Sequence, residues 1–223
     1  HCPNCAQAIR WYDNIPIFSY IFLCGKARCC KAKISFRYFI VEILTASAFL
    51  VLFSAFGLTP KFFAYAIMAS SLIVATFVDF EIQEIPDEVS IGALVIGLIL
   101  AIAFPSILNE TTRLNSFLNS ILGALAGGGM IYAMGVLGEF AFKREAMGGG
   151  DVKLLAMIGA FIGWKLTVLT FFLAPVFGSV VGITLKIRYG KEIIPYGPYL
   201  SLAAVCSIFF GERILRLLFY GLH

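Results

Sequence analysis

The sequence is poor in charge: of its 223 residues, only 13% are Asp, Glu, Lys or Arg, against about a quarter in an average soluble domain. Hydrophobic residues make up 60% of the chain, and the mean hydropathy is +0.92. A chain of this composition cannot cover its own surface with polar groups. The sequence therefore excludes an ordinary soluble domain and predicts a protein that is surrounded by lipid.

Other absences narrow the function. No basic run with interleaved aromatic residues is present, which argues against a nucleic-acid partner. The two histidines, His1 and His223, are the chain ends, so a serine–histidine or histidine–zinc mechanism finds no internal imidazole. Strand-type alternation is missing from the apolar segments, which argues against a membrane β-barrel and against a soluble methyltransferase domain.

Long apolar segments are what the sequence has instead. We predict an all-α polytopic membrane protein, because backbone groups in lipid must form their hydrogen bonds within each segment. About seven transmembrane helices are expected, at 39–57, 62–78, 89–104, 116–139, 152–164, 166–185 and 197–218. Four glycines should let two of these helices approach closely: Gly123, Gly127, Gly128 and Gly129.

The first 38 residues differ from the rest, because they are polar and hold five of the six cysteines. We predict a small cysteine-containing domain at 1–38 and a transmembrane domain at 39–223. If seven segments alternate across the bilayer, most of the 17 basic residues share the side of residues 1–38, which predicts that this side is cytoplasmic. The chain begins with His1 rather than Met, so we expect residues upstream of it.

An acidic segment, ATFVDFEIQEIPDEVS, interrupts two apolar segments and contains no basic residue. Asp79 directly follows an apolar run, so it should lie at or just inside the membrane boundary, where an ionisable side chain is a functional candidate. Pro86 should end one helix. Asp87 can be explained as an acid in the first turn of the next helix, where it interacts favourably with the helix dipole.

A second candidate, Asp151, follows three glycines in MGGGDVKLL. Aspartate is a favoured helix cap, which is one explanation of its position. The glycines favour another role, because a backbone without side chains lets a second chain approach closely. A flexible linker and a phosphate cradle are the alternatives, although a cradle would follow a strand and no strand pattern precedes Gly148.

Asp79 and Asp151 fall on the same predicted face of the membrane. Two carboxyl groups that meet can share one proton: the charged one activates water, and the protonated one donates to a substrate carbonyl. This is the chemistry of aspartic proteases. The alternative from another class is an ion-coupled transporter, which predicts inverted repeats and acids near the membrane midplane.

An ordered set of motifs extends over nearly the whole chain: CPNC at 2–5, WYDNIP at 11–16, ISFRY and VEILTA within 34–46, D…IPD at 79–87, GGGDVKLLAMIGAF at 148–161 and PYGPYLSLAA at 195–204. With these motifs the chain resembles the type IV prepilin peptidases, membrane aspartyl proteases of the GxGD kind. The resemblance implies that Asp79 and Asp151 are the catalytic pair. It also implies eight helices, one of them upstream of CPNC.

The resemblance further implies substrates and a cofactor. Family members cut the basic leader from type IV prepilins or type II secretion pseudopilins after a glycine, at the cytoplasmic face of the bacterial inner membrane. Many also methylate the new N-terminal residue, usually phenylalanine, with S-adenosylmethionine. We expect five residues to support the substrate or the loops around the site: Pro86, Asp87, Gly148, Gly150 and Lys153.

Cys2 and Cys5 have the spacing of a metal knuckle. The family pattern has a second pair, which would fall at 27 and 30, but residue 27 is alanine. The predicted zinc ligands are Cys2, Cys5, Cys30 and Cys29, with Cys24 as an alternative to Cys29. Reduced thiols without a metal are the other interpretation. Because the resemblance associates methyl transfer with this region, Ala27 leaves open a peptidase that lacks the methyltransferase activity.

Overall fold

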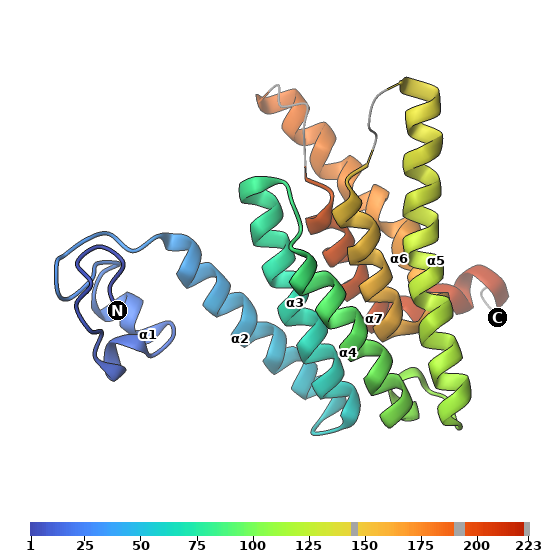
Figure 1. The fold of residues 1–223 in the computed structure, drawn as a ribbon, viewed down its shortest axis with the longest axis horizontal. Helices are drawn as coiled ribbons and strands as arrows, with labels where there is room; N and C mark the ends of the chain where they lie inside the picture. Colours follow the sequence, from blue (N-terminus) through green and yellow to red (C-terminus); the bar gives the residue numbers. More distant parts are fainter. Residues whose placement is uncertain (144–146, 190–194, 221–223) are drawn as a thin grey trace. The chain divides into compact units, whose positions relative to one another are not determined.

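The computed structural model describes residues 1–143, 147–189 and 195–220 (Figure 1). Within these ranges the structure is helical and contains no strand; Lys26 and Lys33 form an isolated β-bridge. The chain groups into two compact units, His1–Ala55 and Phe56–His223. The all-α prediction is confirmed.

The first unit consists of tight turns and one long helix. Its elements are the 3-10 helix η1 (Trp11–Asn14), α1 (Phe18–Phe22) and most of α2 (Phe36–Phe56). A γ-turn precedes α1: Ile17 has φ 66° and ψ −56°, and the Phe18 N–H donates to the Pro16 carbonyl at 2.7 Å. This turn is rare and strained for a β-branched residue. The Glu42 carboxylate on α2 accepts the Ile17 N–H at 2.7 Å and so holds the turn in place.

The second unit is a bundle of helices. Its elements are α3 (Pro60–Ile82), α4 (Asp87–Ala103), η2 (Pro105–Leu108), α5 (Arg113–Phe142), α6 (Gly149–Tyr189) and α7 (Gly197–Tyr220). Helix α6 packs against α3, α4, α5 and α7. Among the described residues, four helices are long and apolar enough to cross a membrane, namely α2, α3, α5 and α6. The chain is a multi-pass membrane protein, as its composition predicts.

The seven predicted segments correspond to α2 to α5, the two halves of α6, and α7. Gly163 interrupts α6 with φ 74° and ψ 169°, a conformation that is nearly restricted to glycine. At this break Asn119 on α5 replaces a helical hydrogen bond, because its side-chain oxygen accepts the Trp164 N–H at 3.2 Å. The amide group of Asn119 donates to Glu110 at 3.0 Å. The segments predicted at 152–164 and 166–185 are therefore two helices that meet at Gly163 without a loop. The chain reverses direction there, because the Leu155 carbonyl and the Thr167 side chain, one from each half, both lie within 3.0 Å of the Cβ position of Gly127 (Figure 1).

Glycines bring α5 close to α6. A Cβ atom at Gly123 or Gly127 would overlap a backbone carbonyl of α6, and one at Gly128 would lie 3.4 Å from the Ala156 side chain. The prediction of a close contact is wrong for Gly129, because no atom lies within 4 Å of its Cβ position. Three of the four glycines thus serve helix packing, which in lipid depends on van der Waals contact.

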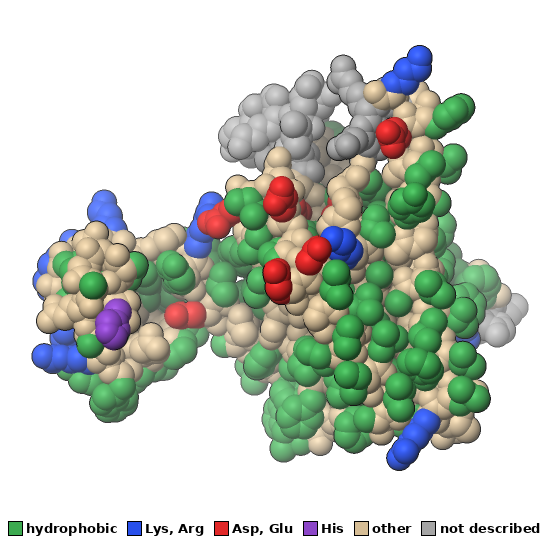
Figure 2. All heavy atoms as spheres, viewed as in Figure 1, with side chains coloured by type: hydrophobic (Ala, Val, Ile, Leu, Met, Phe, Trp, Pro, Cys, Tyr) green, Lys and Arg blue, Asp and Glu red, His purple; other side chains and the backbone are tan. Residues whose placement is uncertain are grey.

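Apolar side chains cover the outward face of the bundle. On α4, the exposed residues Ile91, Val95, Ile99 and Ile102 recur every three or four positions and so form one face. Figure 2 shows hydrophobic side chains over most of the visible surface of the bundle, with acidic side chains gathered near the start of α4. This is the surface expected of a bundle whose sides contact lipid and whose end contacts water.

Candidate active site

Asp79 lies in the last turn of α3, and only 5% of the residue is exposed. The helix ends four residues later, where Gln83 adopts the left-handed conformation and its N–H donates to the Asp79 carbonyl at 3.1 Å. The Gly197 N–H, at the start of α7, donates to the Asp79 carboxylate at 3.0 Å. This N–H belongs to the first turn of a helix and has no partner within it, so it is free to stabilise negative charge on that oxygen.

Asp151 lies in the first turn of α6 and is half-buried. Its own N–H donates to the Gly148 carbonyl at 3.2 Å, which forms a tight turn at the helix start. The preceding residue, Gly150, lies against Ile85, and Ile85 also lies against Gly197, whose N–H binds Asp79. The structure therefore brings the two predicted acids into one site, from the end of α3 and the start of α6.

Ile85, in the connection between α3 and α4, is buried between the helix starts that carry the site. A Cβ atom at Gly150 would lie 3.0 Å from the Ile85 Cβ, and one at Gly197 would lie 3.3 Å from the Ile85 Cδ1. Both glycines leave room for this one side chain. By contrast, a Cβ atom at Gly148 would lie 3.7 Å from the Asp151 carboxylate, an ordinary contact, and Gly149 faces open space.

The other predicted supporting residues lie at the start of α4. Pro86 immediately precedes the helix, and its carbonyl accepts the N–H groups of Val89 and Ser90 at 3.2 and 3.1 Å. Asp87, the first residue of α4, forms an ion pair of 2.5 Å with Lys153 on α6. Both side chains are exposed, so this pair contributes little to stability. It does connect the helix that carries Asp151 to the acidic segment.

Tyr196 directly precedes α7, next to the residue that binds Asp79. Its hydroxyl is buried and has no hydrogen-bond partner among the residues that the structure describes. Burial raises the pKa of Tyr196 to about 12, with the nearby Asp151 carboxylate as the second cause. The phenol is therefore neutral and able to donate throughout the physiological pH range.

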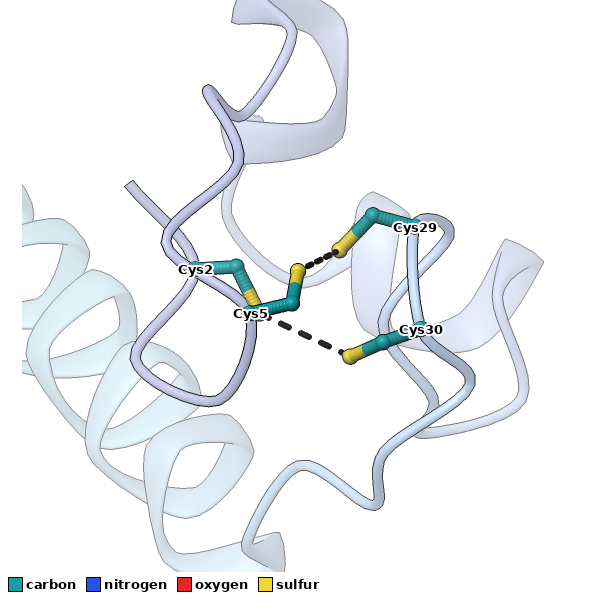
Figure 3. Close-up of side chains that lie close together, drawn as sticks. All are labelled: Cys2, Cys5, Cys29 and Cys30. Carbon is teal, nitrogen blue, oxygen red and sulfur yellow. Dashed lines mark hydrogen bonds between the residues drawn. The ribbon is translucent and has the colours of Figure 1, made fainter.

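In the first unit, the four cysteines predicted as ligands converge (Figure 3). Their sulfur atoms all lie within 4.8 Å of one another; the Cys2 and Cys30 sulfurs are 3.8 Å apart, and the Cys5 and Cys29 sulfurs are 3.3 Å apart. Four thiolates around a tetrahedral zinc ion, at about 2.3 Å from the metal, lie roughly 3.8 Å apart. The cluster thus has the ligand type, number and spacing to hold a metal ion.

Two tight turns present these thiols. In the first, the Ala6 N–H donates to the Cys2 carbonyl at 2.8 Å, and in the second the Lys31 N–H donates to the Ala27 carbonyl at 2.9 Å. Ala27 keeps the backbone place of the expected ligand, while Cys29 supplies the fourth sulfur. The N–H groups of Asn4 and Cys5 lower the pKa of Cys2 to about 6, whereas the hydrogen bond with the Cys5 thiol raises the pKa of Cys29 to about 12.

Comparison with known proteins identifies the family. The model of the type IV leader peptidase family matches residues 66–183, and the model of the bacterial peptidase A24 N-terminal domain matches residues 1–56. The chain belongs to the type IV leader peptidase family. No solved structure matches the chain.

Curated relatives of this leader peptidase carry two related names. The prepilin leader peptidase/N-methyltransferases of Pseudomonas aeruginosa and Dichelobacter nodosus are each 34% identical to it, covering 96% and 98% of this chain and 72% and 73% of their own. The type 4 prepilin-like proteins leader peptide-processing enzyme of Escherichia coli O78:H11 is 35% identical over 94% of this chain and 74% of its own. The resemblance stated from the motifs is confirmed, and the transporter alternative gains no support.

Three residues of the site in this leader peptidase were not predicted from the sequence: Ile85, Tyr196 and Gly197. Gly197 acts through a backbone N–H, and Ile85 through its shape, so neither residue type indicates the role. Tyr196 and Gly197 do lie within PYGPYLSLAA, a motif of the resemblance. Pro195, Gly197 and Pro198 next to Tyr196 indicate a turn or a helix start, but they do not specify which carboxylate these residues meet.

Proposed function

We propose that this protein is a membrane aspartyl endopeptidase that removes the basic leader of type IV prepilins or type II secretion pseudopilins. It then N-methylates the new N-terminal residue with S-adenosylmethionine. The observation that carries the proposal is the pairing of Asp79 with Asp151 at one end of the bundle, within a chain that belongs to the type IV leader peptidase family.

Peptide hydrolysis follows from a carboxyl pair that shares one proton. The Gly197 N–H stabilises charge on Asp79, so Asp79 is the carboxylate that takes a proton from water. The resulting hydroxide oxygen attacks the carbonyl carbon, while Asp151 gives its proton to the carbonyl oxygen. When the C–N bond breaks, the departing nitrogen takes the proton held by Asp79, and one hydroxyl of the tetrahedral carbon returns its proton to Asp151 as the carbonyl forms again. The products are a leader that ends in a carboxylate and a pilin with a free amino group.

The surroundings of the pair suit such a substrate. A groove of about 560 Å³ between α4, α5 and α6 is lined by apolar residues and includes Val152 and Ala156, which follow Asp151 on its own helix. The apolar helix of a pilin can lie along this groove within the bilayer. The acidic residues before and at the start of α4 attract the basic leader. In this proposal the cut occurs at the cytoplasmic face of the inner membrane.

The cysteine cluster belongs to the same proposal. Zinc held by Cys2, Cys5, Cys29 and Cys30 would cross-link the two turns of the first unit, a structural role in which all four positions are occupied by protein. The methyl donor supplies the transferred carbon, and the amine freed by cleavage accepts it. Methyl transfer therefore depends on cleavage, because only cleavage creates that amine.

The purified protein and a synthetic prepilin test the proposal. We expect the wild type to release the leader, and Asp79→Asn and Asp151→Asn each to remove cleavage. Glu139→Gln, which changes an exposed acid on α5, should cleave at the wild-type rate. Mass spectrometry of the mature pilin should show a gain of about 14 Da only when S-adenosylmethionine is present, the mass of one CH₂ group. Cleavage by both aspartate variants would refute the catalytic pair.

A further inference from the structure

Tyr196 is held at a fixed place at the start of α7. Its carbonyl accepts the N–H groups of Tyr199 and Leu200 at 3.1 and 3.2 Å, so its backbone is part of the start of α7. The next N–H along the chain, that of Gly197, binds Asp79 at 3.0 Å. The side chain of Tyr196 therefore begins one residue away from the hydrogen bond that fixes Asp79.

The Tyr196 hydroxyl is a donor without an acceptor. It is buried, and it forms no hydrogen bond with any residue in the described part of the chain. Buried hydroxyl groups in native proteins are nearly always paired, because leaving one unpaired destabilises the fold. Burial keeps this hydroxyl protonated by raising its pKa, and the nearby Asp151 contributes as the second cause. An unpaired donor beside a catalytic carboxylate is an arrangement that a substrate acceptor would complete.

We propose that Tyr196 is a third catalytic residue, whose hydroxyl donates a hydrogen bond to the scissile carbonyl oxygen as negative charge develops there. The inference rests on the proposed peptidase function and deepens it. The tyrosine keeps its proton throughout, while Asp151 supplies the proton that the carbonyl oxygen takes up. A fixed donor of this kind, unpaired before the substrate arrives, stabilises the tetrahedral intermediate without having to break an existing bond.

The variant Tyr196→Phe removes only the hydroxyl group. In cleavage of a prepilin peptide, we expect kcat to fall about 100-fold, the typical effect of removing one such donor, with KM changed by less than about twofold. The melting temperature should stay the same or rise, because the substitution also removes an unpaired buried group. A structural tyrosine would behave in the opposite way, with a lower melting temperature and no specific loss in kcat.

Tyr199→Phe is the matched control. Tyr199 is buried one turn further along α7, and its ring lies 3.6 Å from the Cβ position of Gly178. We expect its kcat to match that of the wild type. A leader peptide with a tetrahedral hydroxyl in place of the scissile carbonyl gives a second measurement, since Tyr196→Phe should weaken its binding by about tenfold or more and leave binding of the uncleaved peptide unchanged.

The outcomes separate this inference from the function on which it rests. If the wild type does not cleave prepilin, the peptidase proposal fails. If the wild type cleaves and Tyr196→Phe has a kcat within twofold of it, the inference is overturned and the peptidase proposal stands. An equal loss of affinity for the tetrahedral and the uncleaved peptide, or a lower melting temperature, would also overturn it.

Discussion

Replacing each of the three glycines before Asp151 by alanine tests what these glycines do. The three glycines have different surroundings. At Gly149 an alanine Cβ would meet no atom within 4 Å, and at Gly148 it would lie 3.7 Å from the Asp151 carboxylate. At Gly150 it would lie 3.0 Å from the Ile85 Cβ and 3.3 Å from the Ile85 nitrogen. Carbon atoms in contact are normally about 3.5–4.0 Å apart. We therefore expect only Gly150→Ala to disturb the site.

The expected magnitudes follow from these contacts. Gly149→Ala should stabilise the protein by about 0.5–1 kcal/mol, because alanine loses less backbone entropy than glycine when α6 forms. In Gly150→Ala the neighbouring chain must shift by about 0.5–1 Å, and overpacking of this kind costs about 1–3 kcal/mol. Asp151 is the next residue and must move with it. A displacement near 1 Å can reduce catalysis by about 100-fold.

The assay combines cleavage kinetics on a prepilin peptide with thermal unfolding of the same samples. Gly149→Ala should keep the wild-type kcat and melt slightly higher. Gly150→Ala should lose roughly 10- to 100-fold in kcat and melt lower by a few degrees, at about 2–4 °C for each kcal/mol. If Gly149→Ala were as inactive as Gly150→Ala, the packing argument would be refuted. The glycines would then serve the passage of a substrate chain instead.

Three further predictions use matched variants. Gly197→Ala should reduce kcat at least tenfold, because its Cβ would lie 2.7 Å from the carboxylate oxygen that its N–H binds, whereas Gly178→Ala, with an ordinary contact of 3.6 Å, should retain activity. The purified protein should contain about one zinc ion per chain by elemental analysis, and Cys29→Ser but not Cys24→Ser should lower that content. Lys153→Met should change the free energy of unfolding by less than about 1 kcal/mol in a denaturation experiment, since its ion pair is exposed.

The helices and the two acids were predictable because lipid imposes strong rules on a sequence. Apolar length identifies a membrane helix, and a carboxylate such as Asp79 is too costly at its edge to be incidental. The prediction of two segments that meet near residue 165 is also confirmed, because two helices meet at Gly163. The sequence did not indicate how the chain is held at Gly163, because the Trp164 N–H is bound by Asn119 from another helix.

The contacts that complete the site could not be predicted from the sequence either, because they join residues that are far apart in the chain. Gly197 meets Asp79 across 118 residues, through a backbone group that every residue except proline possesses. The fourth cysteine illustrates the same limit. The family's cysteine spacing favours a ligand at position 27, where this chain has alanine. The turn that follows Ala27 brings Cys29 beside Cys5, and the geometry of this turn cannot be read from the sequence.

The placement of the acids at helix ends explains why the pair needs Gly197. Asp79 lies in the last turn of α3, where the helix dipole disfavours a negative charge. Asp151 lies in the first turn of α6, where the dipole favours one. On these grounds alone the charge of the pair would reside on Asp151. The N–H from the start of α7 opposes this preference by stabilising charge on Asp79. Each acid is thereby stabilised as an anion by the start of a helix: Asp151 by that of its own helix, and Asp79 by that of α7.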